Sequence, residues 1–222
     1  SNNGIPDLLD EAKWGIEHLL RMQQKDGSVI AVAALAGASP PSSATGTTYY
    51  GGINTISATS SAAAFAIASG VYRSLGQISF ADTLVKRAKL AWDWSAANPN
   101  VLWRNNESQN GSQGIGAGQQ ETDDYGRTAG SVRAAIFLFG ATGETKYRDY
   151  VDANFRKVHL VEWGYVYPFE GDYQDAMLYY TSLSGATAAT KTAILNAYKG
   201  SINGSDDNLV AVVNKVDPYK AH

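Results

Sequence analysis

The chain has 222 residues, of which 44% are apolar, and a formal net charge of -3 at pH 7. This length suits one large domain or a substantial part of one, and the apolar fraction allows a packed core and argues against disorder. The sequence holds no run of lysine and arginine for a nucleic acid, no apolar stretch long enough for a membrane, and no cysteine for disulfides, thiolate catalysis or zinc–thiolate sites.

Apolar residues recur at helical spacing in seven segments, and no segment shows the clear alternation of a strand. Two long loops, residues 28–54 and 100–122, interrupt the series. Loops of that length are uncommon in a compact domain unless they build a site. The fold class is therefore predicted to be all-α, with helices at residues 7–24, 57–75, 80–97, 124–141, 146–158, 173–181 and 188–202.

A weak internal repeat relates two of the predicted helix–helix turns. Residues 76–82 and 143–149 both read glycine, three residues, an aromatic residue, one residue, aspartate. The glycine suits a helix C-cap, and the aromatic residue would anchor the returning helix. Chance similarity between helical hairpins is an alternative explanation. Repeated hairpins form open solenoids or closed α/α toroids, and the long loops favour a toroid, whose loops surround one mouth.

The stretch QETDDYGR places Glu121, Asp123 and Asp124 at the start of the fourth predicted helix. Such acids could be a catalytic pair, a calcium site or an N-terminal cap. Asp123 at the N-cap position favours the cap, because carboxylates stabilise the positive end of a helix. We expect one aspartate to cap the helix and the other to face a cleft, oriented by Tyr125 and Arg127.

Several stretches, taken in order, resemble glycoside hydrolase family 9, the inverting cellulases with a six-hairpin α/α toroid. These stretches are DLLDEAKWGIEHLLRMQQKDGSV, ATSSAAAFAIASGVYR, FADTLVKRAKLAWDWSAANPNV, RAAIFLFGATGETKYRDYV and DPYKAH. The similarity covers nearly the whole chain. It implies that residues 1–222 form a single partial α/α-toroid domain, the middle of a family 9-like catalytic domain.

The resemblance also implies that the chain lacks catalytic residues. The base of the family lies in a Gly-Trp-x-Asp-Ala-Gly-Asp stretch ahead of the first helix, and its acid is a glutamate beyond the final stretch named above. Neither is found here. We therefore assign no catalytic residue and expect the isolated chain to be inactive, with the remainder of the same catalytic domain as its partner. The resemblance further implies a secreted or periplasmic protein.

Sugar rings present flat C–H faces that stack on aromatic side chains, while acids and amides bind their hydroxyls. In family 9 one loop supplies a stacking tryptophan and then an acid, and Phe169 and Glu170 match these positions. Each aromatic residue could instead belong to the inter-helical core. The predicted contacts to a β-glucan or cello-oligosaccharide are Tyr50, Asp124, Tyr125, Arg127, Trp163, Phe169 and Glu170.

No metal ligand is assigned from the sequence. His18 and His159 share no metal-ligand spacing, so we expect structural roles for both. Family members often bind calcium through an Asp-Glu pair, and the matching positions here are Ala129 and Gly130. Calcium would then require the acids of QETDDYGR to replace that pair. No organic cofactor is expected.

Three hypotheses about function follow from these patterns. The first is a segment of an endo-acting β-1,4-glucanase, in which this chain supplies walls of the substrate cleft. The second is a non-catalytic carbohydrate-binding or scaffold helical domain. The third is another α/α-toroid carbohydrate-active enzyme, such as a lyase or a different hydrolase.

Overall fold

The computed structural model describes residues 5–35, 42, 45–104, 107 and 122–204. Glu121 and the stretch DPYKAH, used in the sequence predictions, lie outside these residues. The described part is mostly helical, as predicted. Its α-helices are α1 (Asp7–Met22), α2 (Thr55–Ser74), α3 (Ile78–Ala97), α4 (Asp124–Thr142), α5 (Thr145–Asn154), α6 (His159–Glu162), α7 (Gly171–Ser182) and α8 (Ala188–Asn203).

The predicted end of the fifth helix was wrong. Instead of running to residue 158, α5 ends at Asn154, whose side-chain amide donates to the Tyr150 carbonyl at 2.9 Å. A 3-10 turn, η3 (Phe155–Lys157), and the short α6 follow, and a second 3-10 turn, η4 (Pro168–Glu170), precedes α7. This broken segment turns the chain at the place where the aromatic residues gather.

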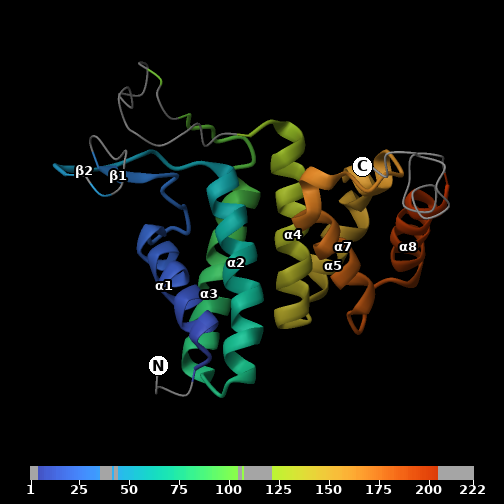
Figure 1. The fold of residues 1–222 in the computed structure, drawn as a ribbon, viewed down its shortest axis with the longest axis horizontal. Coiled ribbons are helices and arrows are strands. Elements are labelled where there is room, and N and C mark those ends of the chain that lie inside the picture. Colours follow the sequence, from blue (N-terminus) through green and yellow to red (C-terminus); the bar gives the residue numbers. More distant parts are fainter. Residues whose placement is uncertain (1–4, 36–41, 43–44, 105–106, 108–121, 205–222) are drawn as a thin grey trace.

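The first long loop contains two short strands that the sequence did not predict. Strands β1 (Ala33–Leu35) and β2 (Thr48–Tyr50) pair antiparallel, with Ala33 opposite Tyr50 and Leu35 opposite Thr48. Threonine and tyrosine favour extended backbone, but three residues are too few to show an alternating pattern. The hairpin projects from the helices at one end of the molecule (Figure 1).

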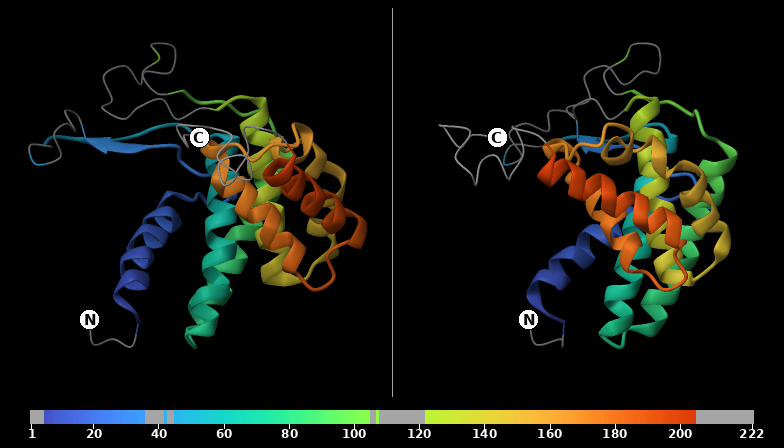
Figure 2. Two further views of the ribbon diagram at one scale, coloured as in Figure 1. Left: turned by 45° about the vertical axis from the view of Figure 1, so that its right-hand side comes forward. Right: turned by 90° about the vertical axis from the view of Figure 1, so that its right-hand side faces the viewer.

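The helices form a row of antiparallel hairpins. Helix α2 packs against α3 and α4, α4 packs against α5 and α7, and α7 packs against α8. Helices α2, α4 and α7 begin at the end that carries the β-hairpin, and α3 and α5 return to it (Figures 1 and 2). Within the described residues the row does not close, because α1 and α8 lie at opposite ends of it (Figure 1).

The two repeated sequences are hairpin turns, as predicted. Gly76 and Gly143 adopt positive φ angles of 75° and 69°, which favour glycine. The aromatic residue four positions later then packs inward. Phe80 meets Tyr72 edge to face with ring centroids 5.0 Å apart, and Tyr147 is fully buried in the core. Both turns lie at the end of the row opposite the β-hairpin.

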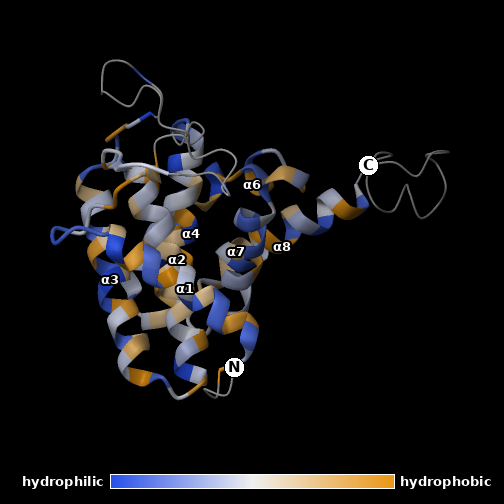
Figure 3. Ribbon diagram, turned by 60° about the vertical axis from the view of Figure 1, so that its left-hand side comes forward, coloured by the Kyte–Doolittle hydropathy of each residue, from blue (hydrophilic) through white to orange (hydrophobic). Residues whose placement is uncertain are grey.

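Small residues allow the hairpin helices to approach closely. The facing sides of α2 and α3 carry fully buried alanines, including Ala62, Ala66, Ala88 and Ala91. Hydrophobic positions gather at the centre of the helical array (Figure 3). Other apolar side chains remain exposed, including Ile67 on α2 and both Leu8 and Trp14 on α1. Among the described helices none combines the length and the apolar character that a membrane span requires.

Candidate functional site

The predicted site residues lie at one end of the helical row. The β-hairpin with Tyr50, the start of α4 with Asp124, and the segment that precedes α7 all occupy this end (Figures 1 and 2). These three segments share one end because helices α2, α4 and α7 begin there. The segment that precedes each of these helices therefore lies on the same side of the molecule. This end therefore has the character of the mouth that the sequence predicted.

Asp123 caps α4, which confirms the cap interpretation. Its Oδ1 accepts a hydrogen bond from the Gly126 amide at 2.8 Å. The side chain of Asp124 is 97% exposed and pairs with Nη2 of Arg127, whose own side chain is buried. A second guanidinium nitrogen, Nη1, donates to the Thr122 carbonyl at 2.8 Å. Arg127 therefore orients Asp124, as predicted.

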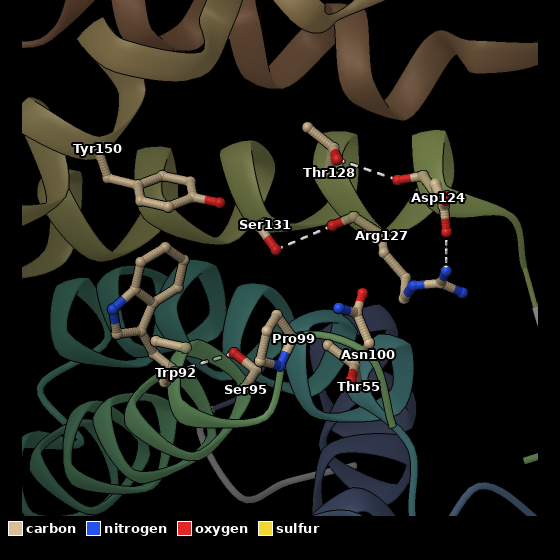
Figure 4. A pocket seen from close by; sticks show the side chains of 11 residues that line it. Thr55, Trp92, Ser95, Pro99, Asn100, Asp124, Arg127, Thr128, Ser131 and Tyr150 are labelled. Atoms are coloured by element: carbon tan, nitrogen blue, oxygen red, sulfur yellow. Dashed lines mark hydrogen bonds and ion pairs between the residues drawn. The ribbon is translucent and has the colours of Figure 1, made fainter. Parts of the chain in front are cut away.

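Beside this pair lies a cavity of about 300 Å³ (Figure 4). Asp124, Arg127, Thr128 and Ser131 line it from one face of α4, and Tyr150 lines it from α5. The opposite wall comes from the start of α2, the end of α3 and the residues that follow it: Thr55, Trp92, Ser95, Ala96, Pro99 and Asn100. Since Asp124 and Arg127 compensate each other's charge, the cavity suits a neutral ligand with hydroxyl groups.

Tyr125 belongs to a different cluster, on another side of α4. Its ring stacks on the His159 imidazole with centroids 3.4 Å apart and planes 5° apart. His159 in turn stacks on Trp163, with centroids 3.3 Å apart and planes 13° apart. We call these three rings the ring stack. The expectation that Tyr125 orients Asp124 was wrong, because neighbouring helical residues point about 100° apart.

Glu170 connects the members of the ring stack. Its Oε2 accepts from the Tyr125 hydroxyl at 2.6 Å, and its Oε1 lies 2.7 Å from Nδ1 of His159. The Tyr125 hydroxyl also accepts from the His159 amide at 3.2 Å. An ionised carboxylate can only accept, so with Glu170 in that form Nδ1 of His159 is the donor in this pair. The Glu170 side chain is 13% exposed, so it faces the rings and not the solvent.

The environment of Tyr125 changes its acidity. Burial raises the pKa of the Tyr125 hydroxyl, and the hydrogen bond to Glu170 raises that pKa further. Both effects penalise a phenolate, because a second negative charge would face the Glu170 carboxylate in a poorly solvated place. Tyr125 is therefore a neutral donor to Glu170 at physiological pH.

Beyond the ring stack, aromatic side chains continue along the segment between α6 and α7. Trp163 meets Tyr167 edge to face at 5.8 Å, and Tyr167 meets Phe169 at 5.4 Å between centroids. Trp163 is 53% exposed and Phe169 is 83% exposed. We call Trp163, Tyr167 and Phe169 the aromatic ledge. The alternative that these side chains belong to the core does not hold for Trp163 and Phe169.

The predicted site residues fall into three places. Asp124 and Arg127 line the cavity, and Tyr125 and Glu170 support the ring stack that ends at Trp163 on the aromatic ledge. Tyr50 is 63% exposed on the β-hairpin, on the far side of α2 and α4 from the ledge (Figure 1). His159 was expected to be structural only. The sequence did contain a signal for this contact, because His159 and Trp163 are four residues apart and so lie one helical turn from each other.

The positions that match a family calcium pair carry no carboxylate. Ala129 is buried, and so is Gly130. One turn further along α4, the guanidinium of Arg133 pairs with Asp172 of α7 and lies 5.1 Å from the centroid of the Tyr173 ring. Within the described residues, no three histidine, aspartate or glutamate side chains are grouped to hold a metal ion.

Comparisons with known proteins agree with this architecture. The sequence model described as glycosyl hydrolase family 9 matches residues 1–221. A cellodextrinase of Butyrivibrio fibrisolvens is 28% identical over 163 residues, covering 72% of this chain and 28% of the relative. A cellulose 1,4-beta-cellobiosidase of Acetivibrio thermocellus is 28% identical over 161 residues, covering 68% of this chain and 17% of the relative.

Solved structures show the same fold. A metagenome-derived glycoside hydrolase family 9 endoglucanase is 27% identical with a TM-score of 0.75, and the match covers 90% of this chain and 36% of that structure. A family 9 protein of Bacteroides ovatus is 22% identical with a TM-score of 0.76, covering 100% of this chain and 40% of that structure. The chain thus spans less than half the length of the relatives named here. Its matched residues, 1–221, identify it as a member of glycosyl hydrolase family 9.

Proposed function

We propose that this chain is part of an endo-β-1,4-glucanase-like glycoside hydrolase and supplies walls of its substrate cleft. The substrate would be a β-glucan chain or a cello-oligosaccharide. The observation that carries the proposal is the aromatic ledge, whose Trp163 and Phe169 rings are exposed at the mouth of the helical row. Family membership and the names of the relatives support the same class of substrate.

The ledge has the chemistry that a β-glucan requires. The C–H faces of glucose rings in an extended chain pack against flat aromatic surfaces, and the ring hydroxyls need polar partners beside them. Trp163 and Phe169 offer such surfaces on either side of Tyr167. The cavity beside Asp124 and Arg127, at the same end of the helical row, offers hydroxyl, amide and carboxylate groups without net charge.

The acids of the described site favour a binding role over a catalytic one. Inverting hydrolysis uses two carboxyl groups about 6.5–9.5 Å apart, one to protonate the leaving oxygen and one to activate water. Here Asp123 is engaged as a helix cap, Asp124 pairs with Arg127, and both oxygens of Glu170 face the ring stack. We propose that the acid and the base come from the remainder of the same catalytic domain.

Two further properties belong to the proposal. Hydrolysis of a glycosidic bond by an acid and a base needs no organic cofactor, and the ledge needs no calcium to bind a sugar face. A cellulosic polymer is too large to enter a cell, so an enzyme that acts on it would be secreted or periplasmic.

Binding of cellohexaose to the chain, measured by isothermal titration calorimetry, tests the proposal. Trp163→Ala and Phe169→Ala are each expected to weaken binding about tenfold, which corresponds to about 1.4 kcal/mol. Trp14→Ala is the matched control, because the exposure of Trp14, 68%, lies between those of Trp163 and Phe169, whereas Trp14 lies on α1. Equal affinity of all four proteins would refute a role for the ledge.

Turnover separates the enzymatic hypothesis from the binding hypothesis. The isolated chain is expected to release no reducing ends from a soluble cellulose derivative, since Asp123, Asp124 and Glu170 are engaged in contacts within the chain. The full-length protein is expected to do so. A full-length protein that binds cellohexaose but never cleaves a β-glucan would favour a non-catalytic carbohydrate-binding domain.

A further inference from the structure

We infer that His159 is a positioning residue for substrate binding: clamped between Tyr125 and Trp163 and tied to Glu170, it presents the outer face of Trp163 to a sugar ring. This inference rests on the proposed function and adds the residue that organises the ledge. It also gives Glu170 a different role from the sugar contact that the sequence suggested.

Trp163 is the outermost ring of the ring stack, because His159 lies between it and Tyr125. The three rings are nearly parallel, with interplanar angles of 5° and 13°. His159 covers one face of the indole, and Trp163 remains 53% exposed. A sugar ring that stacks on the exposed part of the indole would continue the stack by one more layer.

The backbone around Trp163 cannot hold the indole in place by itself. Helix α6 has only 4 residues, and Gly164 follows Trp163 with a φ of 64°. So short a helix has little stability of its own, because its few hydrogen bonds barely offset the entropy of ordering it. The orientation of Trp163 must therefore come from side-chain contacts. Among the described residues, the His159 ring stacks on the indole and Tyr167 meets it edge to face.

His159 is itself fixed from several sides. Glu170 of η4 holds its Nδ1, and Tyr125 of α4 covers its other face and accepts from its amide. Glu170 also binds the Tyr125 hydroxyl, so the three residues form a closed network across α4, α6 and η4. Aromatic pairs prefer offset or edge-to-face arrangements, so a parallel overlap at 3.3 Å needs such lateral restraint.

A positioned indole improves binding in a specific way. A side chain that is already held in its bound orientation loses less conformational freedom when the ligand arrives. Removing His159 would leave the Trp163 side chain in the protein but free it to rotate. His159 and Trp163 should therefore act as one unit, and their effects on affinity should not add.

A double-mutant cycle on the chain, with cellohexaose as the probe, tests this coupling. His159→Ala and Trp163→Ala are each expected to weaken binding about tenfold, and the double variant should bind no more weakly than Trp163→Ala alone. His159→Phe keeps a flat ring but loses the bond to Glu170, so it should bind cellohexaose more tightly than His159→Ala and less tightly than the wild-type chain. Two effects that multiply, giving about a hundredfold loss in the double variant, would overturn the inference.

A spectroscopic arm tests the position of Trp163 without any ligand. The Trp163 contribution is obtained from polarised emission intensities. Those of Trp163→Phe are subtracted from those of the wild-type chain, and those of the double variant with Trp163→Phe and His159→Ala from those of His159→Ala, before each anisotropy is calculated. Loss of His159 should lower the Trp163 anisotropy at a temperature at which the far-ultraviolet circular dichroism shows that the variant is still folded. An unchanged Trp163 signal would refute the positioning role. A wild-type chain that did not bind cellohexaose would refute the proposed function. The fluorescence measurement needs no ligand, so it would still decide whether His159 positions Trp163.

Discussion

We expect the hydroxyl group of Tyr147 to lower the stability of the chain. The residue is fully buried at the start of α5, and its hydroxyl has no hydrogen-bond partner among the described residues. Burial also raises the pKa of the Tyr147 hydroxyl, as does the nearby charge of Glu144. A buried polar group without a partner costs about 1–3 kcal/mol, because it gives up its hydrogen bonds to water.

Tyr147→Phe removes this cost and keeps the ring contacts. The edge-to-face contact with Trp92 at 5.6 Å and the ammonium of Lys146 at 4.8 Å from the ring centroid need only the ring. Allowing for the small void that replaces the oxygen, we expect a gain of about 1 kcal/mol in the free energy of unfolding. For a chain of this size that gain raises the melting temperature by roughly 2–4 °C.

Tyr180→Phe is the matched control. Tyr180 is also fully buried, but its hydroxyl donates to Asp152 at 2.9 Å and accepts from the Thr187 amide at 3.3 Å. Removing it leaves both partners short of a bond, and should cost about 1–3 kcal/mol. Urea unfolding followed by circular dichroism measures both variants. If Tyr147→Phe destabilised the chain as much as Tyr180→Phe does, the Tyr147 hydroxyl would have a partner, such as a buried water.

Three further predictions concern the cap, the turns and the tyrosines. Asp123→Ala should lower the free energy of unfolding by about 0.5–2 kcal/mol. Asp124→Ala removes a solvent-exposed carboxylate from its pair with the buried Arg127 side chain, and should cost about 0–1 kcal/mol in the same urea assay. Equal losses would contradict the cap. Gly143→Ala should destabilise the chain by about 1 kcal/mol, because the φ angle of Gly143 is positive. Gly70→Ala in α2, where an added methyl group meets nothing within 4 Å, should stabilise the chain by about 0.4–1 kcal/mol. Thermal melts that rank the two variants the other way would contradict this prediction. Burial raises the pKa of several tyrosines, so the stability they contribute is complete below the unfolded value of about 10 and is lost as pH rises through the folded values. Phenolate absorbance should therefore appear in two stages, exposed tyrosines first, and a single early stage would contradict the burial of Tyr72, Tyr125, Tyr147, Tyr150, Tyr173 and Tyr180.

Features encoded by neighbours along the chain could be predicted from the sequence. The period of apolar residues located the long helices, and Asp123 and Gly143 marked the start and the end of α4 because caps depend on local backbone geometry. The β-hairpin was missed, since its strands are too short to show a period. The early end of α5 was missed because the apolar spacing continues through the 3-10 turn η3 to Phe155 and Val158, which are both buried.

The ring stack could not be predicted, because it depends on contacts between distant parts of the chain. Tyr125 and His159 are 34 residues apart, and no periodic pattern reports which face of α4 meets the turn after α5. The sequence therefore grouped Tyr125 with its neighbour Asp124. It also read Glu170 as a free acid, because a carboxylate that is satisfied internally looks the same in a sequence as one that faces solvent.

The arrangement of the helices, in which each hairpin packs mainly against the next one along the chain, has a consequence for how the molecule opens. Contacts between near neighbours in sequence close short loops, so folding can begin at any hairpin and spread to the adjacent one. Helix α4 packs against α2, α5 and α7, so its backbone amides should exchange with solvent most slowly. Helix α1 rests on α2 at the edge of the row, partly through the bond from the Tyr72 hydroxyl to the Leu9 carbonyl at 2.7 Å. The backbone amides of α1 should exchange first, so local unfolding should begin at the edge of the row and reach α4 last.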